Sequence, residues 1–323
     1  MRKAVVRTQD FLRKLDRIKC DVTINELITI FGSEIVFMQS NDKVQRSMLN
    51  STKRSQLRKI EKLVLEEIEF LVFNVSTKTL PSSITQYRRA LKEFNSNHPA
   101  LFYFKLPKSE YQKRRDEYDA MVTEERNNLI PFSRSKIQPY INKLVSMLSS
   151  NDPFDIAVAL VGLTGRRPGE ILLTAQFLPS VECKYTDNSV IFSGQLKGKG
   201  SESARDNYEI PILCDDEQIV INALAKLRNI VDFSSIQVPI EKTLGQVINS
   251  KTAPKMKLAL KKNLSAFFEN IHPHSLRSLY AEICSVEYRP GTVSPSVFFS
   301  EVLGHSENND TVFKSYEDFT IVD

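Results

Sequence analysis

Two adjacent arginines follow an almost wholly apolar run in the stretch "PFDIAVALVGLTGRRPGE", residues 153–170. An apolar run without a polar face is typical of a helix that is buried on all sides, and Pro153 suits the first turn of such a helix. A second helix is predicted over residues 166–177, with Pro168 near its first turn. The sequence therefore predicts a buried central helix that ends where the arginine pair opens the next helix.

The segments around this stretch predict a mainly α fold with a small β-sheet or hairpin. Residues 133–150 have the apolar spacing of a helix. Residues 189–200 and 207–213 are rich in strand-forming side chains and predict two short strands joined by a loop. From Asp215 to the end, the pattern predicts helices again.

The front half of the chain is also predicted to be helical. Apolar residues recur at helical spacing over 44–73 and again over 81–94, where Ser82 or Ser83 is the expected N-cap. Residues 107–129 are strongly charged with few apolar positions, which is typical of an exposed linker helix rather than a core helix.

A change of character near Pro131 predicts two domains, and 323 residues are enough for both. We expect a basic helical domain over residues 1–126, with the linker helix at its end, and a second domain over residues 127–323.

Positive charge is concentrated in the front domain. The chain has a net charge of +5, but residues 1–126 hold 24 Lys and Arg against 17 Asp and Glu, whereas the remainder holds 20 against 22. Runs of this kind occur on nucleic-acid-binding surfaces and also on ordinary solvated helices. Because residues 2–19 and 43–62 each carry seven basic residues, we favour nucleic acid. The side chains expected to contact phosphates are Lys53, Arg54, Arg58, Lys59, Arg88, Arg89 and Lys92.

Several kinds of site are not supported by the motifs present. The four cysteines are far apart and form no CxxC pair, which predicts free thiols in a reducing compartment and no zinc site. His272 and His274 have no evident partner ligands, so no metal is expected. Residues 194–201 lack the spacing of a phosphate-binding loop, and no cofactor is predicted. Without a leader or a long apolar run, the chain is expected to be cytoplasmic and without a membrane partner.

Five short segments supply side chains suited to one phosphate: "TGRRPGE" (164–170), "GQLKGK" (194–199), "HSLR" (274–277), "LGH" (303–305) and Tyr316. Each of them alone is more often surface or packing. Arginine can pair with two phosphate oxygens, histidine can donate or shuttle a proton, and lysine can protonate a leaving oxygen. A tyrosine oxygen can attack phosphorus and store the bond energy in a covalent intermediate. Together the segments predict metal-independent phosphoryl transfer.

These segments resemble the motifs of tyrosine recombinases. "TGRRPGE" resembles their first arginine box, "HSLR" matches their HxxR motif, and "LGH" with a following Tyr resembles their closing box. The doubled Arg before Pro, the "IFSGQLK" strand and the eleven-residue gap from His to Tyr resemble telomere resolvases (protelomerases) in particular. The resemblance covers about residues 134–323, with a weaker similarity in "SITQYRRALKEF". It implies a helical N-terminal DNA-binding domain followed by a tyrosine-recombinase-like catalytic domain.

The resemblance also implies roles for individual residues. Arg167 corresponds to the first arginine because it precedes Glu170 by three positions, and Lys197 corresponds to the hairpin lysine. Arg166 and Lys199 are their neighbours and rivals, expected to contact DNA. The remaining implied site residues are the second arginine Arg277, His274 of the HxxR motif, the last histidine His305, and the nucleophile Tyr316.

The implied activity is telomere resolution. A homodimer would bind double-stranded DNA with an inverted-repeat target site, and each Tyr316 would cut one strand to leave a 3′-phosphotyrosine. Each free 5′-end would then attack the opposite phosphotyrosine and close a hairpin, without ATP, metal or cofactor. Such a protein would act on the nucleoid in a phage or bacterial setting.

Three alternatives share the same residues. A site-specific tyrosine recombinase or integrase would exchange strands between two duplexes, and a type IB topoisomerase would relax supercoils. A DNA-binding protein with an inactive catalytic fold is the third, but the intact set of candidate residues argues against it.

Overall fold

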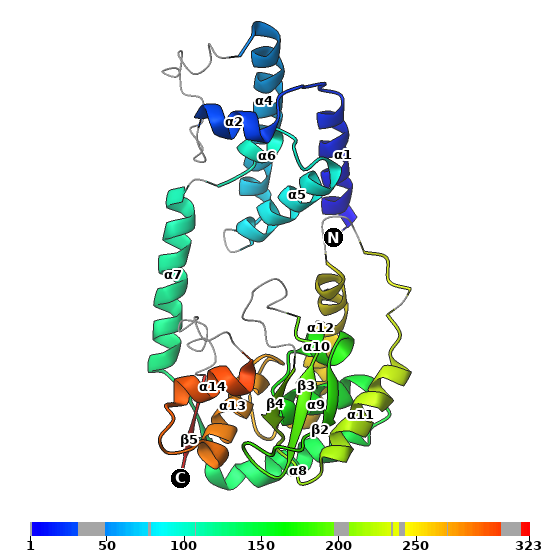
Figure 1. The fold of residues 1–323 in the computed structure, drawn as a ribbon, viewed down its shortest axis with the longest axis vertical. Coiled ribbons are helices and arrows are strands. Elements are labelled where there is room, and N and C mark those ends of the chain that lie inside the picture. Colours follow the sequence, from blue (N-terminus) through cyan, green and yellow to red (C-terminus); the bar gives the residue numbers. More distant parts are fainter. Residues whose placement is uncertain are drawn as a thin grey trace. The chain divides into compact units, whose positions relative to one another are not determined.

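The computed structural model describes residues 2–31, 49–76, 79–106, 108–196, 207–233, 235–238, 243–269, 271–304 and 318–323. It divides into two compact units: Met1–Glu117 with Gln237–Thr243, and Tyr118–Ile236 with Leu244–Asp323. Helices predominate in both units, and short strands occur in the second (Figure 1). The predicted mainly α fold with a small β component is therefore confirmed.

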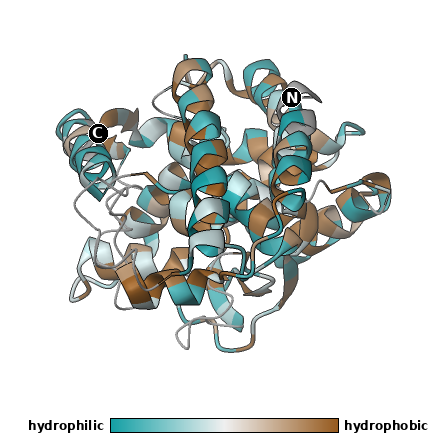
Figure 2. Cartoon of the chain, turned by 90° about the horizontal axis from the view of Figure 1, so that it is seen from above, coloured by the Kyte–Doolittle hydropathy of each residue, from teal (hydrophilic) through white to brown (hydrophobic). Residues whose placement is uncertain are grey.

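The first unit is built from amphipathic helices. Its elements are α1 (Arg2–Asp16), α2 (Ile24–Phe31), α4 (Ser51–Asn74), α5 (Leu80–Phe94) and α6 (Ala100–Tyr103). Leu57, Ile60 and Val64 of α4 are buried, and α4 packs against the short α6, all four residues of which are buried. Figure 2 shows hydrophilic and hydrophobic residues side by side along many helices, as expected of helices that bury one face.

The start of α5 differs from the sequence prediction. The helix begins at Leu80 with Thr79 as its N-cap, not Ser82 or Ser83. Pro81 lies in the first turn, where a missing backbone N–H costs nothing because helix N-termini leave those groups unpaired. The hydroxyls of Ser82 and Ser83 donate to the Thr79 carbonyl, at 2.7 and 3.2 Å.

The predicted linker is a helix, α7 (Lys108–Asn127), and most of its described side chains are exposed. The division between the two units falls inside it, after Glu117.

A buried helix forms the centre of the second unit, as predicted. α9 (Pro153–Thr164) has Asp152 as its N-cap, whose side chain accepts from the Phe154 N–H, and every residue from Asp155 to Thr164 is buried. The helices packed against α9 are α8 (Ile137–Leu148), α10 (Pro168–Leu173), α11 (Glu217–Ile230), α12 (Leu244–Leu264) and α13 (Ser275–Tyr288).

The two predicted strands are present, but a third was missed. β3 (Ser189–Ser193) pairs antiparallel with β4 (Asn207–Pro211), and on its other edge with β2 (Gln176–Pro179). β2 occupies the end of the stretch predicted as helix over 166–177. That helix stops at Leu173 because Phe177 reaches the core through strand pairing, which local spacing does not reveal.

The end of the chain is also a strand, contrary to the helix expected there. After α14 (Pro295–Leu303), β5 (Phe319–Val322) pairs in parallel with β1 (Ile130–Ser133), in the register Ile130 to Phe319. The partners are far apart in the sequence, so neither strand could be recognised from its own short pattern. A 3₁₀ turn, Arg134–Lys136, leads from β1 into α8. Among the described residues, no helix is long and apolar enough to cross a membrane.

Candidate active site

Glu170 organises the start of α10 around Arg167. The Glu170 carboxylate is fully buried and accepts from the Arg167 backbone N–H at 2.9 Å and from the Arg167 Nη1 at 2.8 Å. Burial favours the neutral acid, but the charges of Arg277, Arg167 and Arg166 and the Arg167 N–H outweigh it and lower the pKa of Glu170. The acid is therefore held as a carboxylate that fixes one side of the Arg167 guanidinium.

Arg166 has different hydrogen-bond partners from Arg167. It is fully buried, and its Nε donates to the Thr164 carbonyl at 3.1 Å, its Nη1 to the Tyr208 hydroxyl and its Nη2 to the Val302 carbonyl. The guanidinium carbon also lies 4.8 Å from the centre of the Phe192 ring. The Arg166 side chain therefore links α9, β4 and α14. This favours a structural role over the DNA contact suggested by the sequence.

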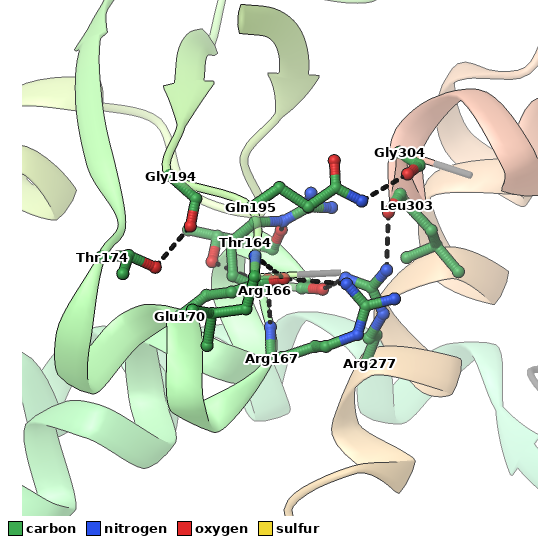
Figure 3. Close-up of polar contacts among 12 residues, drawn as sticks. Thr164, Arg166, Arg167, Glu170, Thr174, Gly194, Gln195, Arg277, Leu303 and Gly304 are labelled. Carbon is green, nitrogen blue, oxygen red and sulfur yellow. Dashed lines mark hydrogen bonds and ion pairs between the residues drawn. The ribbon is translucent and has the colours of Figure 1, made fainter. Parts of the chain in front are cut away.

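Arg277 joins the same region from α13. It is fully buried, and its two terminal nitrogens donate to the Gly165 carbonyl and, at 2.6 Å, to the Leu303 carbonyl. Figure 3 shows the side chains of Arg167 and Arg277 converging from α10 and α13. Two arginine boxes that are 110 residues apart in the sequence therefore meet at one place.

Three consecutive carbonyls at the C-terminal end of α14 accept from three different motifs. The Val302 carbonyl accepts from Arg166. The Leu303 carbonyl accepts from Arg277, and the Gly304 carbonyl accepts from the Gln195 Nε2 at 2.6 Å (Figure 3). Helix C-termini leave such carbonyls unpaired and carry partial negative charge, so cationic and amide donors stabilise them.

Glycine is required where α14 ends. Gly304 has a φ of +67°, and a Cβ at this position would lie 1.9 Å from the Tyr208 hydroxyl. The same Tyr208 hydroxyl accepts from Arg166, so a side chain in place of the "LGH" glycine would also disturb the partner of Arg166. His305 follows Gly304 in the sequence and lies outside the described residues, as do Lys197, Lys199 and Tyr316.

The exit of β3 is fixed beside the same site. Thr174 Oγ1 donates to the Gly194 carbonyl, and the Leu196 N–H donates to Glu170 Oε1 at 3.4 Å. Leu196 directly precedes Lys197 in the sequence. Leu196, which precedes Lys197, therefore lies beside Glu170, and Gly304, which precedes His305, lies at the end of α14.

Two supporting residues were missed by sequence reasoning. Arg228 of α11 donates to the carbonyls of Leu172, Glu170 and Ala175, at 2.6, 3.2 and 3.4 Å, and so holds the end of α10. No local motif signals it. Ser278, the neighbour of Arg277, donates to Asp318 Oδ2 at 2.7 Å and anchors the start of β5.

The two histidines of the "IHPH" segment are exposed, His274 at the start of α13. Among the described residues, no group of three or more His, Cys, Asp or Glu side chains is placed to hold a metal ion.

The basic side chains of the first unit fall into two groups. Three are bound within the protein: Lys53 pairs with Glu26 at 3.3 Å, Arg89 with Glu93 at 3.2 Å, and Arg88 donates to the Leu101 and Phe104 carbonyls. Burial lowers the pKa of Arg88 from its usual value. The side chains of Arg58, Lys59 and Lys92 are exposed, and that of Arg54 is half-buried. The first group already has partners in the protein, while the second is placed to meet solvent or a polyanion.

The second unit matches a known catalytic domain. Residues 128–319, more than half of the chain, match the family described as the telomere resolvase ResT/TelK catalytic domain. This chain belongs to the telomere resolvase family. The resemblance seen in the arginine boxes and the closing segment is therefore confirmed.

Curated protelomerases are also similar to this chain in sequence. The protelomerase of Klebsiella oxytoca phage phiKO2 is 28% identical over 236 residues, which are 68% of this chain and 36% of that protein. The chain thus spans about a third of that relative's length.

Solved structures share the fold of this telomere resolvase. A variant of protelomerase TelA covalently complexed with substrate DNA gives a TM-score of 0.70 at 24% identity, over 87% of this chain and 93% of that one. A second TelA variant, complexed with a DNA hairpin product, gives 0.67 at 25% identity, with the same coverage.

Proposed function

We propose that this chain cuts double-stranded DNA at an inverted-repeat site and closes each end as a covalent hairpin. The observation that carries this proposal is the meeting of Arg167 and Arg277 beside Glu170, next to the helix end that leads to His305. Two fixed guanidinium groups suit the charge that gathers on a phosphodiester during substitution. Membership of the telomere resolvase family and the printed complexes of its structural relatives support the DNA substrate.

The chemistry proceeds in two balanced steps. The Tyr316 oxygen forms a bond to phosphorus, its proton passes to a base for which His305 is the candidate, and the bond to the 5′-oxygen breaks. Lys197 gives that oxygen a proton, which leaves a 3′-phosphotyrosine and a free 5′-hydroxyl. In the second step, a 5′-hydroxyl from the opposite strand gives its proton to Lys197 and forms a bond to phosphorus, and the bond to the Tyr316 oxygen breaks as that oxygen regains a proton from His305. His274 remains a candidate for donating a hydrogen bond to the phosphate.

We also propose the arrangement in which this happens. Two copies of the chain act on one inverted repeat, the domain of residues 1–126 holds the duplex, and residues 127–323 cut it. The reaction takes place on the nucleoid in the cytoplasm of a bacterium or a phage-infected cell.

A denaturing gel tests the proposed function. The full chain is incubated with a linear duplex that carries the inverted repeat flanking its own gene. Hairpin closure yields strands of twice the half-site length that renature at once. Strand exchange between two duplexes would instead identify a recombinase, relaxed plasmid would identify a topoisomerase, and binding alone would identify an inactive fold.

Cleavage is expected to proceed unchanged in excess EDTA. Arg167 and Arg277 supply the positive charge that a metal ion provides in other phosphoryl-transfer enzymes. The rate of covalent adduct formation is measured with and without the chelator on metal-stripped protein. A rate that collapses with EDTA and returns with one divalent ion would contradict the proposed chemistry.

Replacing the exposed pair Arg58 and Lys59 by alanine is expected to weaken the salt dependence of DNA binding. Each phosphate contact contributes a slope of about −0.9 in log affinity against log salt, so the slope should become shallower by about 1.8 if both contact DNA. The matched control replaces Lys53 and Arg89, which already pair with carboxylates and should change the slope less. Equal slopes for the parent and the Arg58/Lys59 variant would show that this run is only solvated surface.

A further inference from the structure

The helix that carries Arg167 at its start is too short to keep its own place. α10 has six residues, with Arg167 as its N-cap and Glu170 in its first turn. Isolated helices shorter than about 12 residues are marginal in water, so α10 depends on contacts from other elements. Figure 3 shows the ion pair of Arg167 with Glu170 at this helix start. The position of the Arg167 guanidinium therefore depends on what anchors α10.

Arg228 of α11 anchors the opposite end of α10. Its Nη1 donates to the Leu172 carbonyl at 2.6 Å, and its Nη2 donates to the carbonyls of Glu170 and Ala175, at 3.2 and 3.4 Å. Carbonyls at a helix C-terminus lack partners within the helix and carry partial negative charge, and a planar guanidinium can serve several of them at once. Burial lowers the pKa of Arg228, which is half-buried, so these carbonyls replace water around a partly desolvated charge.

Glu170 connects Arg228 to Arg167. Its backbone carbonyl accepts from Arg228, while its buried carboxylate accepts from the Arg167 backbone N–H at 2.9 Å and from the Arg167 Nη1 at 2.8 Å. Close-packed interiors transmit displacements, so a shift of the Glu170 backbone moves the carboxylate and the guanidinium bound to it. All three residues of this path lie in the part of the chain that the structure describes.

We propose that Arg228 is a positioning residue, which keeps the Arg167 guanidinium where it meets a non-bridging oxygen of the scissile phosphate. The inference rests on the proposed function, since it concerns the transition state of that reaction. Arg228 acts on the phosphate only through α10 and Glu170. Charge-assisted pairs of arginine with phosphate are directional, and a misplacement of about 1 Å can cost about 100-fold in rate.

A double-mutant cycle tests the inference. Single-turnover adduct formation is measured at saturating protein on a nicked duplex, on which religation is blocked and a slow reaction still accumulates product. In the parent chain, Arg228→Ala is expected to slow the reaction by about 10- to 100-fold, up to the effect of a misplacement of about 1 Å. In the Arg167→Ala background, the same change should alter the rate by less than about threefold, because the group that Arg228 positions is gone.

Two further variants complete the comparison. Lys226→Ala is the matched control, because Lys226 lies on the same helix and donates to the Ser149 and Ser150 carbonyls, at 3.1 and 2.8 Å, just beyond the end of α8. It should react like the parent. Arg228→Lys keeps a positive charge with fewer donors, so its rate should fall between those of Arg228→Ala and the parent. It takes the place of Arg228→Ala in the cycle if urea denaturation shows that the alanine variant is unfolded.

The other outcomes overturn the inference. An equal loss in both backgrounds would show that Arg228 supports the fold or the site independently of Arg167. No loss in the parent chain would show that α10 holds Arg167 without Arg228. A loss with Lys226→Ala as large as that with Arg228→Ala would assign the effect to α11 as a whole. A parent protein that forms no adduct would instead refute the proposed function, and the inference with it.

Discussion

Replacing Tyr316 with phenylalanine is expected to abolish the covalent protein–DNA species. The change removes one oxygen, and loss of the nucleophile in other covalent enzymes costs about 10⁶-fold in rate. Tyr316 lies outside the described residues, but the chain on both sides of its segment is anchored in the second unit. Gly304 is held by Gln195 before the segment, and Asp318 is held by Ser278 after it.

The measurement is adduct formation on a nicked or sulfur-substituted duplex, on which religation is blocked and even a slow reaction accumulates product. DNA affinity should stay close to that of the parent. Tyr118→Phe, an exposed tyrosine of α7, is the matched control and should react normally. A covalent adduct trapped with Tyr316→Phe would show that another group attacks the phosphate.

Lysine substitutions at the adjacent Arg166 and Arg167 are expected to have opposite effects. Arg166→Lys cannot serve three acceptors that lie in different directions, and each buried oxygen left without a donor costs about 1–3 kcal/mol. We therefore expect its free energy of unfolding to fall by about 2–5 kcal/mol. Arg167→Lys keeps a positive charge beside Glu170 and should change the free energy of unfolding little.

For the rate of DNA cleavage, the larger effect is expected from Arg167→Lys. Lysine lacks the planar fork that pairs with two phosphate oxygens, so Arg167→Lys should lose about 3–4 kcal/mol of transition-state stabilisation, as does loss of one oxyanion donor. Urea denaturation gives the stability, and single-turnover cleavage at saturating protein gives the chemistry. If Arg166→Lys keeps full stability and loses cleavage instead, the phosphate-facing arginine is Arg166 and the register of "TGRRPGE" is shifted by one.

The sequence by itself was enough to recognise the family. The chemistry demands particular residue types, and they occur in the arginine boxes, the "LGH" segment and the following tyrosine. The family match confirms the resemblance. The buried helix α9 and the strands β3 and β4 were also predictable, because each has a local pattern of apolar residues with one period.

The tertiary structure gives Arg166 and Arg167 different surroundings. The spacing to Glu170 favoured Arg167 as the first arginine, but the sequence left Arg166 as a rival. Their difference comes from partners far away in the chain: Tyr208 and Val302 for Arg166, against Glu170 for Arg167. The same reason separates Arg88, which is bound to the α6 carbonyls, from the exposed Arg58.

The other features that the sequence did not predict also depend on contacts between distant segments. β2, and the pairing of β1 with β5, depend on strands whose hydrogen-bond partners are distant in sequence. Gln195 and Arg228 become part of the site only because folding brings the carbonyls of α14 and α10 to them. A sequence determines which groups can take part in the chemistry, because each residue carries its own donors, acceptors and charge. Which partners each group has is decided by folding, since contacts between distant segments bind some of them inside the protein and leave others exposed.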